Sequence, residues 1–357
     1  MKGGSGAVRP MEGHGAYNRS SRVQAAGLVP AISLLQEAAR SVPLPPAPQP
    51  LILADYGCSE GRNSIRPIAA AVAILRERTG PSRPISLVFT DLPENDFSAL
   101  FQTLAEDPES IARSDSQVFA CAIGRSYFEQ LIPAETLSLG WSSWSVQWLS
   151  RVPAKIPDQV QAAYSRDEAA RVAFAAQAAD DWRAFLSRRA TELRPGGQLV
   201  VLTMASDERG FGYEPLVRAM YEALEAMVAE RFLHARELHA MVIPTVGRSR
   251  ADFLAPFGSK GEFCGLALGE LQIFEGEDRI WNDYERDRNA EAFGAEWARF
   301  SRASVFPSLA SALESGGAPR SAEFFNRLEA GLAMRLAREP QRMAIPLARM
   351  AFSRTAT

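Results

Sequence analysis

The chain is poor in the residues that build metal centres and covalent cross-links. Its 357 residues include only three cysteines and three histidines. The cysteines, Cys58, Cys121 and Cys264, lie far apart, and no two stand at the spacing of a zinc site. We therefore expect neither a disulfide framework nor a bound metal ion.

Long apolar runs and an excess of basic charge are also missing. No run approaches the roughly 18 apolar residues of a membrane-spanning helix, and residues 1–10 lack the apolar core of a signal peptide. The net charge is −3 and the pI is near 5.8, which leaves no basic footprint for nucleic acid. We expect a cytoplasmic protein with neither a membrane nor a nucleic acid as its partner.

Strand and helix patterns alternate along much of the chain, and 46% of its residues are hydrophobic. This pattern predicts an α/β fold with a parallel sheet and a large core. The expected strands cover residues 51–55, 85–91, 117–123, 136–139, 198–204, 271–274 and 343–351. The expected helices cover 31–39, 64–78, 167–193, 214–232 and 321–338, with Ser321 as the cap of the last one.

The alternation breaks after the fifth expected strand, which predicts a cap over the carboxyl edge of the sheet. We therefore expect three parts. They are a flexible amino-terminal tail at 1–15, a core formed by 16–205 and 267–357, and a mainly helical cap at 206–266.

The turn after the first strand is the most informative motif. The strand ends in Asp55, and Gly57 and Gly61 let the backbone turn sharply and approach a ligand before the helix at 64–78. The dinucleotide fingerprint G-x-G-x-x-G is absent. A second acidic strand end, at Asp91, stands where a carboxylate accepts hydrogen bonds from a ribose diol. These features predict a nucleotide-type cofactor site.

Five separated blocks carry a resemblance to one family, and they follow one another in the family's order. The blocks are 17–24, 55–64, 91–97, 126–133 and 142–153. On these residues the chain resembles the SABATH family of carboxyl and N-methyltransferases, which use S-adenosylmethionine. The resemblance implies a Rossmann-like class I methyltransferase sheet with a helical cap. The richness in Ala, Arg and Pro is more typical of a bacterial member than of a plant one.

The resemblance also assigns the cofactor residues. The positions that match the family's cofactor site are Ser21, Asp55, Gly57, Cys58, Asn63, Asp91, Leu92, Ser126 and Tyr127. It implies that Ser21 and Asn63 meet the methionine end of the cofactor. It further implies that Asp91 and Leu92 meet the ribose and adenine, and that Ser126 and Tyr127 flank the adenine.

The acceptor site follows from the same resemblance. It implies that Gln24 and Trp148 hold a substrate carboxylate through amide and indole N–H donors, and these two are the expected catalytic residues. The expected substrate-binding residues are Tyr17, Gln24, Trp141, Trp144, Gln147 and Trp148. A carboxylic acid with a pKa near 4 is ionised at neutral pH. In-line attack on the sulfonium methyl therefore needs no general base.

Three functions remain open on the sequence. Retention of Gln24 and Trp148 favours a small carboxylic acid as the acceptor, and we expect a homodimeric carboxyl methyltransferase. Gln147 leaves a ring nitrogen of a xanthine-like heterocycle as an alternative methyl acceptor, because the family's xanthine N-methylating members carry Gln at this position. A protein that binds S-adenosylmethionine without catalysis is the third possibility.

Overall fold

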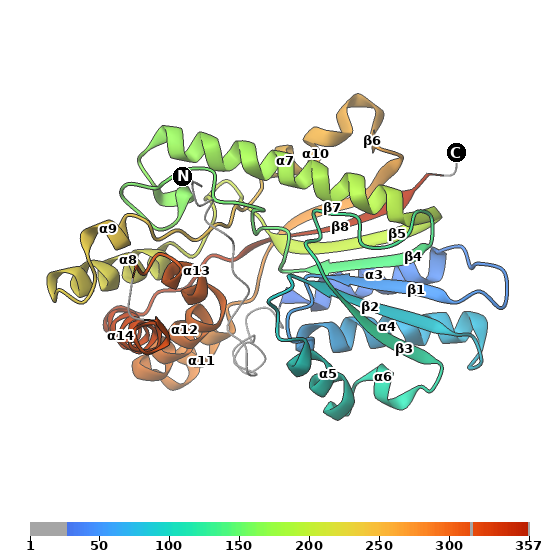
Figure 1. The fold of residues 1–357 in the computed structure, drawn as a ribbon, viewed down its shortest axis with the longest axis horizontal. Coiled ribbons are helices and arrows are strands. Elements are labelled where there is room, and N and C mark those ends of the chain that lie inside the picture. The colour runs from blue at the N-terminus through green and yellow to red at the C-terminus, as the bar shows by residue number, and fades with distance from the viewer. Residues whose placement is uncertain (1–26, 315–316, 356–357) are drawn as a thin grey trace.

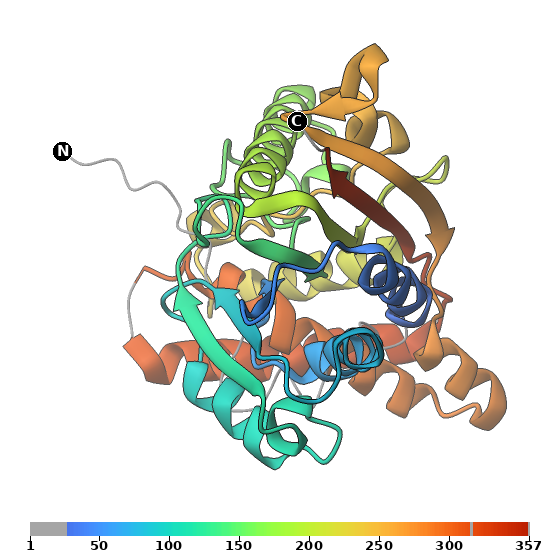
Figure 2. The same ribbon diagram turned by 90° about the vertical axis from the view of Figure 1, so that its right-hand side faces the viewer.

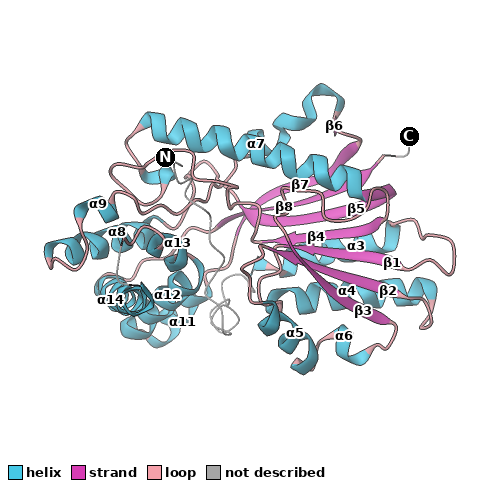
Figure 3. Cartoon of the chain, viewed as in Figure 1, coloured by secondary structure: helices cyan, strands magenta, loops and turns pink. Residues whose placement is uncertain are grey.

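A single mixed sheet organises the protein, whose computed structural model describes residues 27–314 and 317–355. The strands are β1 (Leu51–Tyr56), β2 (Ile85–Asp91), β3 (Val118–Gly124), β4 (Leu137–Ser143), β5 (Leu193–Met204), β6 (Glu262–Phe263), β7 (Leu266–Glu275) and β8 (Pro346–Arg354). Their order in the sheet is β3-β2-β1-β4-β5-β8-β7-β6. The first five strands run parallel, and β8, β7 and β6 join antiparallel to their neighbours. The predicted α/β fold is confirmed (Figures 1 and 3).

Helices cover both faces of this sheet. The helices are α3 (Val29–Ser41), α4 (Arg62–Thr79), α5 (Phe97–Glu106), α6 (Ile111–Ser114), α7 (Glu168–Glu192), α8 (Glu214–Ala229), α9 (Ala235–Leu238), α10 (Arg250–Leu254), α11 (Arg279–Asp287), α12 (Ala290–Ser304), α13 (Phe306–Ala310) and α14 (Gly317–Arg338). Short 3-10 turns lie at Ala162–Tyr164 and Ala255–Lys260. Figure 2 shows α3 and α4 on one face of the sheet and α7 on the other.

The alternation of side chains along β5 separates two hydrophobic cores. Val200 and Leu202 point into the core beneath α3 and α4. Leu199 and Val201 point into the core beneath α7. All four side chains are fully buried, and each contributes roughly 1.5–3 kcal/mol by leaving water. The strand sequence therefore has apolar residues at successive positions, as expected for a strand covered on both faces.

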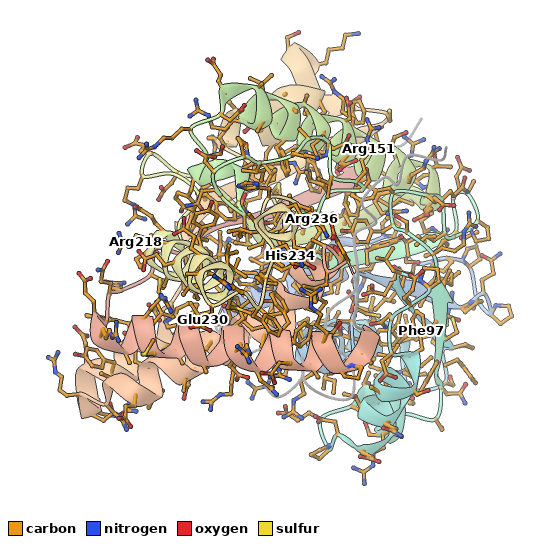
Figure 4. All side chains as sticks on the ribbon, turned by 60° about the vertical axis from the view of Figure 1, so that its left-hand side comes forward. Phe97, Arg151, Arg218, Glu230, His234 and Arg236 are labelled. Atoms are coloured by element: carbon orange, nitrogen blue, oxygen red, sulfur yellow. The ribbon has the colours of Figure 1, made fainter. Side chains whose placement is uncertain are left out.

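A separate helical layer stands beside the sheet (Figure 1). In this layer α8 packs against α14, and α14 packs against α12. Gly294 of α12 permits that close approach, since a Cβ there would lie 2.2 Å from the carbonyl oxygen of Ala333 in α14. Figure 4 draws the side chains of this layer and labels Glu230 and His234 at the turn between α8 and α9.

The predicted cap at 206–266 therefore shares its packing with later helices of the chain. The segments at 279–304 and 317–338 form the helical layer together with α8. By contrast, α10 lies near α7 and β7, because Trp182 Nε1 donates to the Phe253 carbonyl at 3.1 Å and Arg250 donates to the Leu271 carbonyl at 3.0 Å. The division into tail, core and cap stays a prediction, and the tail at 1–15 lies outside the described residues.

Several boundaries differ from their predictions, and two of the differences have a clear physical reason. The last helix begins at Gly317, not at Ser321, since Pro319 fits the first turn of a helix. The Ser321 hydroxyl instead donates to the Gly317 carbonyl at 3.2 Å. The last strand begins three residues late because side chains accept the preceding N–H groups. Asp278 accepts from Met343 at 2.9 Å, and Glu275 accepts from Ile345 at 2.6 Å.

Candidate active site

The predicted turn after β1 forms a narrow cradle. Gly57 and Gly61 both adopt a positive φ of 84°, which L-residues with side chains rarely tolerate. The N–H groups of Gly57 and Cys58 donate to the Thr90 carbonyl at 2.8 and 3.1 Å, which ties the turn to β2. A Cβ at Gly57 would lie 2.1 Å from the Ser145 hydroxyl oxygen. Only glycine fits this position, because the turn packs directly against Ser145 in the loop after β4.

Two carboxylates face this cradle. Asp55 is 3% exposed and accepts a hydrogen bond from the Ser64 hydroxyl. Burial raises the pKa of Asp55 to about 7, although the Ser64 bond lowers it, and the charge of Asp91 raises it further. Asp91 accepts from the N–H groups of Ser59 at 2.7 Å and Leu92 at 2.8 Å, and burial raises its pKa as well. In the described part of the chain, no ion pair joins a cation to either carboxylate.

This charge distribution suits a cationic ligand. A buried carboxylate is costly unless a positive group compensates it, and the sulfonium and amino groups of S-adenosylmethionine would supply that charge. Cys58 is buried beside the same carboxylates, and burial followed by the charge of Asp91 raises the pKa of its thiol well above the ordinary value. Cys58 is thus a neutral packing residue at neutral pH, in accord with its place in the turn.

The predicted adenine wall lies on the segment after β3. The Tyr127 hydroxyl donates to the Ser145 carbonyl at 2.9 Å, and the Ser126 hydroxyl oxygen accepts from the Phe128 N–H at 3.3 Å. The Tyr127 and Phe185 rings meet edge to face at 5.9 Å. Ser126 and Tyr127 are therefore fixed next to the Gly57 turn through Ser145, which contacts both segments.

A buried ion pair from α7 holds this segment, and no pattern in the sequence indicated it. The Arg189 guanidinium donates to the Tyr127 carbonyl at 2.7 Å and to the Glu129 carbonyl at 3.0 Å. It also bonds to both oxygens of Glu192 at 2.8 Å, and both side chains are 0% exposed. Glu192 in turn accepts from the Leu131 N–H at 2.6 Å and from the Tyr56 hydroxyl at 2.5 Å.

A pocket of about 630 Å³, partly open to solvent, adjoins the cradle between the sheet and the helical layer. Helices α8 and α12 give one wall, which includes Leu216, Met220 and Phe300. Of the predicted substrate residues, Trp144, Gln147 and Trp148 line it from the loop after β4.

The segment at 245–246 holds the loop at 144–148. Trp148 forms a β-bridge with Thr245, and the Gln147 carbonyl accepts from the Val246 N–H at 2.9 Å. Trp148 is half-buried, and its indole N–H has no hydrogen-bond partner among the described residues. It is thus a donor that a ligand in the pocket can use.

The remaining predicted residues fall in different places. Trp141 is 1% exposed in the core below β4 and is not among the described residues that line the pocket. Its role as a substrate contact stays a prediction. Asn63 is half-buried in the first turn of α4. Tyr17, Ser21 and Gln24 lie outside the described residues.

Metal-binding clusters and membrane-spanning helices are both absent from residues 27–314 and 317–355. No group of three or more His, Cys, Asp and Glu side chains there could hold a metal ion. None of the described helices combines the length and the apolar character needed to cross a bilayer. The expected absence of a metal remains a prediction.

The cradle, the adjoining pocket and the sheet together define a methyltransferase of the S-adenosylmethionine-dependent class. The solved structure of loganic acid methyltransferase with SAH has the same fold, with a TM-score of 0.76 and 19% identity over 98% of this chain and 99% of that one. The chain itself belongs to the family of SAM dependent carboxyl methyltransferases, whose model matches residues 7–351. The predicted family, fold class, enzyme class and cofactor are confirmed.

Named relatives agree with this family. Indole-3-acetate O-methyltransferase 1 of Arabidopsis thaliana is 28% identical over 303 residues, which cover 77% of this chain and 76% of that protein. Methyltransferase LUC1 of a Fusarium species is 33% identical over 250 residues, or 68% of this chain. That second match spans 65% of the relative's own length, slightly less than two thirds.

Proposed function

We propose that this protein transfers a methyl group from S-adenosylmethionine to the carboxylate of a small, largely apolar acid. One observation carries the proposal: the pocket beside the cofactor cradle is apolar, yet Trp148 contributes an indole N–H that the described residues leave unused. No Asp, Glu, Lys, Arg or His is among the described residues that line the pocket. A neutral donor orients an anion without forming an ion pair that would reduce its nucleophilicity.

The proposed mechanism depends on positioning. S-adenosylmethionine, when bound, supplies a methyl group on a positively charged sulfur. A carboxylic acid of pKa near 4 is ionised at neutral pH, so the chain needs no proton acceptor. Trp148, with Gln24 as a predicted second donor, orients one carboxylate oxygen toward the cradle at Gly57. The apolar walls from α8 and α12 exclude water and fix the rest of the acid.

The nature of the acid is also part of the proposal. The wall includes Trp144, Phe211, Tyr213 and Phe300, and large flat rings stack well on a ring in the ligand. The relative named for indole-3-acetate supports an aromatic acid. The absence of charged groups in the described lining disfavours acids with a second ionised group.

The bonding of Gln147 supports a carboxylate over a ring nitrogen. A xanthine-like acceptor would need free polar groups along its edges, but the Gln147 amide is already bonded to Trp144 and Thr203. The non-catalytic alternative is disfavoured by the unused indole N–H beside a complete turn at Gly57. We further propose the cytoplasm as the location and a homodimer as the assembly, the latter testable by light scattering in solution.

A panel of acids tests the function directly. Purified protein and S-adenosylmethionine are incubated with aromatic and aliphatic acids, with the primary amide of each acid as the matched control, and methyl esters are detected by mass spectrometry. We expect esters from at least one acid and no product from its amide, since a neutral amide oxygen is a poor nucleophile and its NH2 group meets donors. Methylation of xanthine with no ester from any acid would overturn the proposal.

The pH dependence gives an independent check. For a carboxylate acceptor, kcat/KM should fall as the pH drops through the substrate's own pKa, at about 4 to 5, with no further group titrating between about 6 and 8 on the acceptor side. Binding of S-adenosylmethionine should be measured at each pH, because Asp55 titrates near 7.

A further inference from the structure

Trp144 has an unusual backbone conformation at the point where the sheet meets the acceptor pocket. Its φ is 55°, in the left-handed region that bulky residues avoid. Such conformations persist only where the surroundings hold them. The conformation matters for the pocket, because it directs the chain from β4 into the loop whose Trp144 and Trp148 side chains form one wall.

Gln147 holds this conformation from within the loop. Its amide Nε2 donates to the Trp144 carbonyl at 2.7 Å. A carbonyl oxygen can only accept, so the NH2 end of the amide has to face Trp144, and Oε1 has to face the opposite way. There the Thr203 hydroxyl donates to Oε1 at 3.0 Å. Gln147 is 3% exposed and Thr203 is 0% exposed.

The two hydrogen bonds connect the loop to the end of β5. Thr203 pairs with Ala348 in the sheet, so its position is set by the rigid part of the fold. Thr203 is not among the described residues that line the pocket, whereas its neighbour Met204 is. The hydrogen bond to Gln147 gives Thr203 an indirect route to an acceptor, through the loop.

We propose that Gln147 and Thr203 are positioning residues that brace the acceptor loop against β5 and set the placement of the Trp144 and Trp148 indoles. This rests on the proposed function, because the pocket they shape is the acceptor pocket. It differs from the predicted role of Gln147 as a direct substrate contact. Thr203→Val then weakens turnover of the acid although this side chain touches no ligand.

Four variants test the brace. Thr203→Val removes the hydroxyl and keeps the shape, Thr203→Ser restores the hydroxyl as the matched control, and Gln147→Met removes the amide. We expect Thr203→Val and Gln147→Met each to lower kcat/KM for the acid by about tenfold, with S-adenosylmethionine affinity changed less than about twofold. The double variant should be no worse than the more impaired single variant, because both substitutions remove one connected unit. Thr203→Ser should keep most of the activity.

Hydrogen exchange gives a measurement that needs no acceptor. The amides of residues 144–148 should exchange faster in Thr203→Val and Gln147→Met, and those of α4 should not change. Faster exchange without turnover of any acid would support the brace and refute only the proposed function. Unchanged exchange in both variants would overturn the brace. So would a Gln147→Met variant that alters acid selectivity while Thr203→Val behaves as wild type, because Gln147 would then act as a direct contact.

Discussion

Asp55 provides the sharpest test of how the cofactor cradle is built. Its carboxylate is buried, is bonded to the Ser64 hydroxyl, and has no ion-pair partner in the described part of the chain. Asp55→Asn keeps the size and an acceptor for Ser64 but removes the titratable group. We expect this variant to be more stable than wild type at high pH and to bind S-adenosylmethionine more weakly.

The size of the effect follows from the shifted pKa of Asp55, which rises from 3.8 to about 7. Between these values the folded chain holds a proton that the unfolded chain has released, so wild-type stability falls as the pH rises through this window. Each pKa unit corresponds to about 1.4 kcal/mol. Raising the pH from about 5 to about 8 should therefore cost the wild type about 3 kcal/mol that the Asn variant keeps, with the whole effect near 4 kcal/mol.

Urea unfolding of ligand-free protein at several pH values between about 5 and 8 measures this difference. The stability gap between Asp55→Asn and wild type should widen as the pH rises and level off above about 7. Asp180 on α7 is exposed, and Asp180→Asn serves as the matched control for replacing an aspartate by an asparagine. Parallel stability curves for wild type and Asp55→Asn would refute the reasoning, because Asp55 would then titrate normally.

Three further predictions concern the two halves of the site. Asp91→Ala should weaken S-adenosylmethionine binding by roughly 1.5–3 kcal/mol, the usual contribution of hydrogen bonds to a charged group, and calorimetry showing unchanged affinity in a folded variant would contradict this. Gln24→Ala and Trp148→Phe should leave cofactor affinity near wild type and lower kcat/KM for the acid at least about tenfold, or roughly 1.4 kcal/mol. An equal loss in both measurements would contradict this separation. Arg189→Met leaves Glu192 buried and unpaired, so it should destabilise the chain by about 3–5 kcal/mol and weaken cofactor binding. A variant as stable as wild type in urea would argue against the pair holding the segment after β3.

The tight turn after β1 was predictable because its requirements are local in sequence. A buried strand, Asp55 and the two glycines of the turn lie within a few residues of one another. The positive φ of Gly57 and Gly61 favours glycine at both positions. Arg189 and Glu192 carry no such signal. They stand about 60 residues from the segment that they hold, and an Arg and a Glu three apart on a helix usually form a solvated pair.

The acceptor side was predictable only in part, for a related reason. Trp141, Trp144 and Trp148 were all expected to bind the substrate, but the structure places Trp141 in the core and the other two at the pocket. Trp141 points into the core because β4 continues through it to Ser143, beyond its predicted end. Trp144 and Trp148 reach the pocket because the chain turns at Trp144 through a left-handed conformation. Gln147 bonds to the Trp144 carbonyl within this turn, and Thr203 bonds to Gln147 from 56 residues further along the chain, a contact that no local pattern encodes.

The walls of the acceptor pocket come from the loop at 144–148 and from helices α8 and α12. This arrangement affects how the acid specificity of such a protein can change. The loop at 144–148 belongs to both halves of the site, because Ser145 contacts Gly57 and Tyr127 while its neighbours line the pocket. Substitution of Ser145 would therefore alter both halves together, because this residue bonds to Gly57 and to Tyr127. Leu216, Met220 and Phe300 lie on helices remote from the cradle. Changes at these positions can therefore give descendants a new acid specificity while the inherited cofactor machinery stays intact.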